Sequence, residues 1–257
     1  LDTAGPVSID PVRLTAAEMT RPEPLDLTFE GWSVEALAIL DRLRAHPHIE
    51  QYREEKPRIR EHLKEPFKRY RNDLVVNWVL PNRLDFETER NVFSRLLKND
   101  FGAGGCKDNL WMSFYRLGRT RLRDVQLSHR ISPDGFHVSL FVGGYAKDLL
   151  KRAKARIAAE PERYLAALNP LLQEKEWRFY FRRGAGKKKE RHAFERPLDA
   201  LPEGLDRADD IIVRRHFPRE RVLDWGPALV EHALDAVLAL WPIYRFYLEG
   251  KDEWKNG

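Results

Sequence analysis

Basic residues that could bind phosphate are concentrated in two stretches of the chain. Arginine offers a planar, permanently charged fork that matches a phosphate group, and lysine adds a point charge. We therefore predict contacts with the backbone of a nucleic acid. The alternative is that these charges are solvated or paired with acids such as Asp124. The predicted contact residues are Lys98, Arg116, Arg119, Arg121, Arg123, Arg182, Arg183, Lys187, Lys188 and Lys189.

Aromatic residues stand close to both basic stretches. Trp111 and Tyr115 fall in the alternating segment 110–116, and we predict that one of them stacks on a base. A second aromatic group, in 177–181, precedes the second basic stretch. Most of that group is expected to pack in the core, with one ring available for stacking.

Glycines at 99–105 follow a helix-like segment and precede a strand-like one. Backbone N–H groups of such a turn can bind phosphate. The segment lacks the G-x-x-x-x-G-K-[ST] pattern, and its order is helix then strand, so it is not a P-loop. A tight turn is the simpler interpretation.

Catalytic and metal-binding patterns are sparse. Asp100 and Asp124 are the only carboxylates that we single out as catalytic candidates, and Asp124 with Gln126 and nearby cations resembles a metal-dependent nuclease core. The eight histidines form no H-x-x-x-H or H-E-x-x-H pattern, and Cys106 is the single cysteine. We predict no metal and no cofactor, and favour a binding module over an enzyme.

Composition indicates a globular protein in a reducing compartment. The chain has 257 residues, 42% hydrophobic and 33% charged, with a net charge of +5. One cysteine permits no intrachain disulfide, so a cytoplasmic location is expected. No apolar run reaches the roughly 18 residues of a membrane span. Because Leu1 replaces a starting Met, we expect a processed chain or a piece of a longer protein.

Hydrophobic periodicity predicts helices and strands in separate groups. Helical spacing occurs at 33–43, 49–78, 89–98, 146–175 and 227–247, with Pro57, Pro66 and Pro161 dividing two of these ranges. Alternation predicts strands at 110–116, 125–130 and 136–142, and a hairpin with a basic tip at 177–196. Residues 210–217 fit either a short strand or a helix.

These elements predict an α+β fold. An antiparallel sheet, a meander plus the basic hairpin, should be built from 110–142 and 177–196 and covered by helices from both ends of the chain. We expect an extended arm at 1–31, a single domain at 32–250 and a tail at 251–257. Leu25, Leu27 and Phe29 should pack the arm on the body.

The order of these features resembles an uncharacterised bacterial family, a domain of unknown function. The shared elements are an F…L helix, a charged helix with a proline, an ISPDG strand turn and a closing helix. They stand here as Phe29 with 36–40, Glu65-Pro66-Phe67, Ile131-Ser132-Pro133-Asp134-Gly135, and Pro242 with Tyr247-Leu248. The family's R-D-x-R-F motif is absent. Segments 94–102, 111–116 and 125–127 stand in its place, a variant similar to N-terminal domains of McrBC-type GTPase restriction proteins.

The resemblance implies a recognition module in a bacterial defence or restriction-type system. Its partners would be nucleic acid, most often DNA, and a larger protein or motor domain in the same chain or complex. Two alternatives remain open from the residues. One is a metal-dependent nuclease or phosphate-directed hydrolase that uses Asp100 or Asp124, and the other is a protein-interaction adaptor. No membrane partner is expected.

Overall fold

One antiparallel sheet forms the centre of the protein. The computed structural model describes residues 8–98, 104–184 and 189–249. Within them, the sheet has the strand order β1-β2-β3-β4-β7-β5-β6. The strands are β1 (Phe86–Glu87), β2 (Leu110–Arg116), β3 (Gln126–Ser132), β4 (Gly135–Gly143), β5 (Trp177–Arg183), β6 (Glu190–Phe194) and β7 (Asp210–Pro218). The predicted α+β fold with an antiparallel sheet is confirmed.

The late strand β7 joins the two predicted parts of the sheet. It pairs with β4 on one side and with β5 on the other. The segment 210–217, which fits a strand or a helix by sequence, is therefore a central strand. Its apolar residues Ile211 and Val213 are buried on the core face, and β-branched residues suit such a position.

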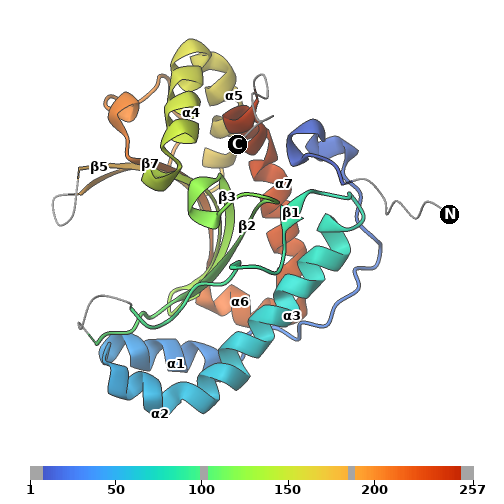
Figure 1. Cartoon of the computed structure of the whole chain (residues 1–257), viewed down its shortest axis with the longest axis vertical. Coiled ribbons are helices and arrows are strands. Elements are labelled where there is room, and N and C mark those ends of the chain that lie inside the picture. Colours follow the sequence, from blue (N-terminus) through green and yellow to red (C-terminus); the bar gives the residue numbers. More distant parts are fainter. Residues whose placement is uncertain (1–7, 99–103, 185–188, 250–257) are drawn as a thin grey trace.

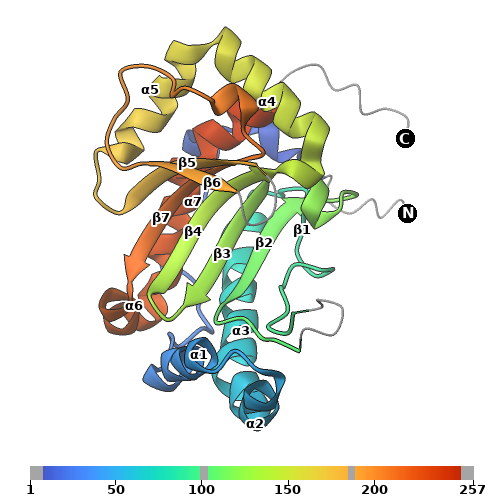
Figure 2. The ribbon, with the colours of Figure 1, turned by 90° about the vertical axis from the view of Figure 1, so that its left-hand side faces the viewer.

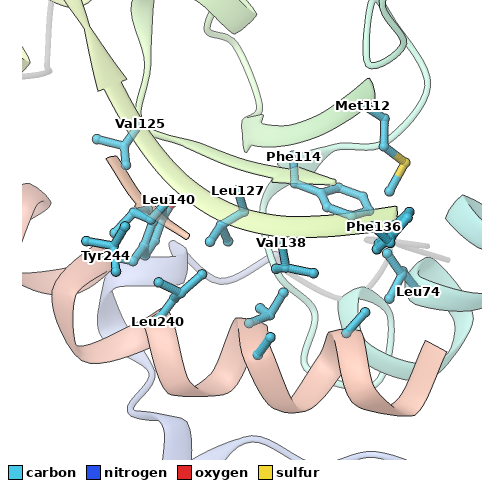
Figure 3. Packing of buried hydrophobic residues seen from close by; sticks show 14 of the residues in the cluster. Leu74, Met112, Phe114, Val125, Leu127, Phe136, Val138, Leu140, Leu240 and Tyr244 are labelled. Atoms are coloured by element: carbon cyan, nitrogen blue, oxygen red, sulfur yellow. The ribbon is translucent and has the colours of Figure 1, made fainter. Parts of the chain in front are cut away.

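Two helices cover one face of this sheet. They are α3 (Glu65–Leu74) and α7 (Leu229–Leu248), and both lie behind the strands in Figure 2. Helix α7 turns Val237, Leu240 and Tyr244 toward the sheet at helical spacing. Figure 3 shows Leu240 and Tyr244 below the strands that carry Leu127 and Leu140. The main hydrophobic core lies between these layers.

The remaining helices lie at the two ends of the strands. Helices α1 (Val34–Ala45) and α2 (Ile49–Ile59) lie at one end of the strands, and α4 (Lys147–Ala159) and α5 (Pro161–Leu172) lie at the other. A short helix, α6 (Arg219–Trp225), follows β7. Figure 1 shows the sheet curving around an open side, and Figure 2 looks onto that open face, which no helix covers.

The prolines in the charged helical region bracket a wide turn. Pro57 lies inside α2 and Pro66 lies in the first turn of α3. Between the two helices, residues Arg60–Lys64 form a π-helical turn. Because proline donates no backbone hydrogen bond, a local change in the ladder is the expected response. The chain thus stays helical across both prolines.

The N-terminal segment lies along α3 and α7. Backbone N–H groups of Thr28 and Phe29 donate to the carboxylate of Asp73, at 2.8–3.0 Å. Farther back, the Leu14 carbonyl accepts a hydrogen bond from Trp241 Nε1 at 2.8 Å. These contacts satisfy backbone N–H and C=O groups that, in an irregular segment, have no hydrogen bonds within a helix or a sheet.

The helix predicted at 89–98 does not form, and that prediction is wrong. Its backbone instead extends beside β2: Ser94 N donates to the Trp111 carbonyl at 2.7 Å, and Ser113 N donates to the Val92 carbonyl at 3.1 Å. Apolar residues at 92, 93, 96 and 97 suit one face of a helix. Their backbone groups find partners on the edge of the sheet, which the sequence pattern does not reveal.

Among the helices that the structure describes, none combines the length and apolar character needed to cross a membrane.

Candidate functional site

The open face of the sheet carries polar and aromatic side chains in cross-strand rows. One row places Trp111, Arg130, His137 and His216 side by side on β2, β3, β4 and β7. The next row holds Ser113, Ser128, Ser139 and Arg214. The third holds Gln126, Phe141, Ile212 and Tyr180. Successive residues of a strand point to opposite faces, so these rows lie opposite the core.

Two of these serines, Ser128 and Ser139, line a pocket on this face. Small side chains in the middle row stand between larger ones in the flanking rows, and this pocket of about 290 Å³ lies there. That volume is close to the lower end of the roughly 300–1,000 Å³ range of small-molecule sites. We call it the sheet pocket. It is lined by Trp111, Leu122, Gln126, Ser128, Arg130, His137, Ser139, Phe141, Tyr145, Tyr180, Arg182, Ile212 and Arg214.

Two arginines in the sheet pocket lack a counter-charge. In the part of the chain that the structure describes, neither Arg130 nor Arg214 forms a hydrogen bond or ion pair, and Nε of Arg214 is buried without a partner. Burial lowers the pKa of both guanidiniums, that of Arg214 to about 10, with Arg130 adding repulsion. Arginine is not deprotonated in proteins at neutral pH, so both carry a positive charge. No carboxylate lines the pocket.

An amide in the pocket is also incompletely bonded. Gln126 is 2% exposed, and its Oε1 accepts a hydrogen bond from Ser113 Oγ at 3.2 Å. Its Nε2 has no partner among the described residues. Buried polar groups normally have partners, so a free donor in a pocket indicates room for an acceptor.

One lining residue of the sheet pocket, His137, is paired with His216 of β7. Nδ1 of His137 and Nδ1 of His216 are 3.3 Å apart, and their ring centroids are 4.5 Å apart. Burial, with the charge of Arg214 second, lowers the pKa of His137 to about 2. His216 and Arg130 act in the same direction, and Asp134 acts against them. The His137 ring is accordingly neutral over the physiological range.

A larger cleft adjoins the sheet pocket. Its volume is about 1040 Å³, and it shares Phe141, Tyr145 and Arg182 with the sheet pocket. We call it the basic cleft. It is lined by Gly118, Arg119, Thr120, Arg123, Phe141, Gly144, Tyr145, Ala146, Lys147, Asp148, Leu149, Arg182, Lys189, Asp209 and Asp210.

The basic cleft brings members of both predicted basic stretches together. Arg119 and Arg123 come from the segment between β2 and β3, and Arg182 and Lys189 come from the hairpin. The carboxylate of Asp210 accepts hydrogen bonds from Arg182 Nε and Lys189 Nζ, both at 2.8 Å. It fixes these two cations at the wall of the cleft.

Other predicted contact residues are engaged within the protein. Nη2 of Arg116 lies 2.6 Å from Oδ1 of the fully buried Asp124. The Tyr115 hydroxyl donates to the carbonyl of Arg90, and its side chain is buried. Nη2 of Arg183 lies 3.5 Å from Oε2 of Glu190. Lys98 is exposed.

Trp111, which we predict as a stacking residue, is partly buried on β2. Its ring lines the sheet pocket, and the guanidinium of Arg121 lies 4.4 Å from the ring centroid. Of the remaining predicted residues, Asp100, Lys187 and Lys188 lie outside the described residues.

Several pocket residues escaped the sequence-based prediction of the site. Arg214 and His137 stand in alternating segments, where period-2 spacing places them opposite Val213 and Val138. That alternation is the signal that could have found them, because each is a cation or imidazole on the face away from the core.

No metal centre is visible in the described part of the chain. It contains no group of three or more His, Cys, Asp or Glu side chains that could hold an ion. Cys106 is buried, and burial raises the pKa of its thiol, so it is not an activated nucleophile.

The chain matches no protein-family model. It matches no curated protein. The resemblance to a bacterial domain family therefore stays a prediction.

Proposed function

We propose that this protein binds single-stranded nucleic acid, with DNA as the preferred strand, along the open face of its sheet. The observation that carries the proposal is that Arg119, Arg123, Arg182 and Lys189 line one cleft although they come from two distant stretches. A row of cations along one groove can follow a phosphate backbone.

The aromatic residues beside the cleft favour a single strand over a duplex. Tyr145 is 78% exposed and lines both the basic cleft and the sheet pocket. Phe141 also lines both. Exposed rings bind the faces of unpaired bases, which a duplex keeps stacked. The charges would supply affinity and the rings would prefer unpaired bases.

The test compares two variants of equal charge change. Arg123→Gln with Lys147→Gln removes two exposed cations of the cleft that form no ion pair among the described residues. Arg60→Gln with Lys64→Gln removes two exposed cations from the helical region at the other end of the molecule. Fluorescence anisotropy with a labelled DNA strand, its duplex and the RNA of the same sequence would measure binding at ~50 mM salt.

Loss of affinity in the cleft variant alone is the expected result. Equal weakening in both variants would indicate attraction by net charge without a defined site. Absence of binding to every strand at this salt concentration would refute the proposal. Tighter binding to the duplex than to the single strand would contradict the role given to the aromatic residues.

A further inference from the structure

The sheet pocket is a separate feature from the basic cleft, and its chemistry is more specific. Its polar lining consists of donors and hydroxyl groups, without a carboxylate. Its two unpaired arginines are held by neighbouring elements: Arg130 by β3 and Arg214 by β7, with β4 between them. Binding along the phosphate backbone of a nucleic acid requires only cations on an open surface, and not charges enclosed in a pocket.

The burial of these charges favours an anionic ligand. Guanidinium groups in protein interiors are normally paired, because removing a charge from water is expensive. Here Arg214 Nε and Gln126 Nε2 are buried without partners, and the charge of Arg130 repels that of Arg214. A phosphate monoester carries close to two negative charges and three acceptor oxygens. Its charge is sufficient to balance both arginines, and its oxygens are acceptors of the kind that the amide lacks.

The walls of the sheet pocket suit a planar ring next to that phosphate. Trp111 stands at one end of the pocket, and Phe141 and Tyr145 stand where the pocket meets the basic cleft. The ring of Tyr180 is held in place, with the Arg191 and Arg214 guanidiniums 4.1 and 5.2 Å from its centroid. A volume of about 290 Å³ leaves room for one nucleotide rather than several.

We propose that the sheet pocket binds a phosphate monoester on a single nucleotide unit, and so recognises the phosphorylated end of a strand whose body lies in the basic cleft. This inference rests on the proposed function for the strand. The phosphate itself has two sources, a free nucleoside monophosphate and a strand end, and the experiment separates them. An internal phosphodiester carries one charge and two continuing chains, which suit this enclosed site less well.

The experiment measures the affinity of the full chain for five probes. These are a DNA strand with a 5′-phosphate, the same strand with a 3′-phosphate, the same strand with hydroxyl ends, a nucleoside monophosphate and the corresponding nucleoside. Anisotropy is used for strands and calorimetry for the small molecules. Loss of one charge-assisted contact should weaken binding by about 10-fold to 100-fold.

Three variants assign the effect to the sheet pocket. Arg130→Gln removes one charge, and Arg130→Lys keeps the charge but loses the fork. Ser128→Leu fills the floor of the sheet pocket while both arginines remain. Arg60→Gln is the control, since this arginine is exposed and lies outside the sheet pocket. Circular dichroism checks that each variant folds, and Ser128→Leu keeps the proposal testable if Arg130→Gln does not.

We expect the wild type to bind one phosphorylated end at least ~10-fold more tightly than the strand with hydroxyl ends. Arg130→Gln and Ser128→Leu should lose this preference, and Arg60→Gln should keep it. Equal affinity for all strands, with Arg130→Gln weakening each alike, would overturn the proposal and leave the proposed function intact. Binding of the monophosphate without any strand would support the phosphate site and refute the proposed function. Absence of binding to every probe would refute both.

Discussion

The buried pair of Arg116 and Asp124 should be a major source of stability. Asp124 is 0% exposed and the Arg116 side chain 11% exposed. The carboxylate accepts from the Arg116 backbone N at 2.9 Å and from Nη2 at 2.6 Å. Removing one partner of a buried pair costs about 3–5 kcal/mol, because the other charge is left uncompensated. We expect Asp124→Ala to lower the free energy of unfolding by this amount.

The free energy of unfolding is measured by urea denaturation and the melting temperature by heating, each followed by tryptophan fluorescence and by circular dichroism. At about 2–4 °C per kcal/mol for a chain of this size, the melting temperature of Asp124→Ala should fall by roughly 6–20 °C. Replacing both partners, as in Arg116→Met with Asp124→Leu, should cost less than Asp124→Ala alone because no orphan charge remains. Asp148→Ala is the control, because that carboxylate is exposed at the rim of the basic cleft.

This experiment also bears on the catalytic role predicted for Asp124. A buried carboxylate held by an arginine is positioned to support the structure, so loss of any activity in Asp124→Ala should accompany loss of folding. An Asp124→Ala protein with an unchanged free energy of unfolding would refute this account. Asp124 would then again be a candidate catalytic carboxylate.

Three further predictions concern stability and pH. Burial lowers the pKa of His129 from 6.5 to about 3, so the unfolded chain binds a proton below pH 6.5 while the folded chain does not. Through this residue the free energy of unfolding should be about 2 kcal/mol lower at pH 5 than at neutral pH. His129→Gln should therefore flatten the dependence of the free energy of unfolding on pH, measured by urea denaturation. Gly135 has φ +132°, and a Cβ would lie 2.1 Å from the Phe217 carbonyl oxygen, so Gly135→Ala should lower the melting temperature far more than Gly118→Ala, where φ is +77° and no atom lies within 4 Å. Monophosphate affinity should rise between pH 5 and 7, because the ligand gains its second charge near pH 6 while His137, with a pKa lowered to about 2, stays neutral; calorimetry showing the opposite trend would contradict the phosphate assignment.

Alternation predicted much of the sheet because it is a local property. In segments 110–116 and 136–142 apolar residues recur at every second position, and the turn that ends at Gly135 joins two paired strands. Segment 89–98 was mispredicted because its apolar spacing is compatible with a helix. Its extended form depends on backbone bonds to β2, which are nonlocal.

The site was only partly predictable for the same reason. The sequence singled out Arg123 and Lys189 as basic, but their meeting at one cleft depends on β7 entering between β4 and β5. Nothing in the local pattern around Arg214 specifies its neighbours. The pairing of Arg116 with Asp124 was foreseen only as an alternative to phosphate binding, since sequence spacing does not report burial.

The salt dependence of strand binding tests the central claim most directly. Each phosphate contact on a single strand contributes about −0.7 to the slope of the logarithm of the association constant against the logarithm of salt concentration. We predict that Arg123→Gln with Lys147→Gln makes this slope shallower by about 1.4, and that Arg60→Gln with Lys64→Gln leaves it unchanged. A wild-type affinity that is independent of salt, or the same slope in the cleft variant as in the wild type, would contradict binding along the open face.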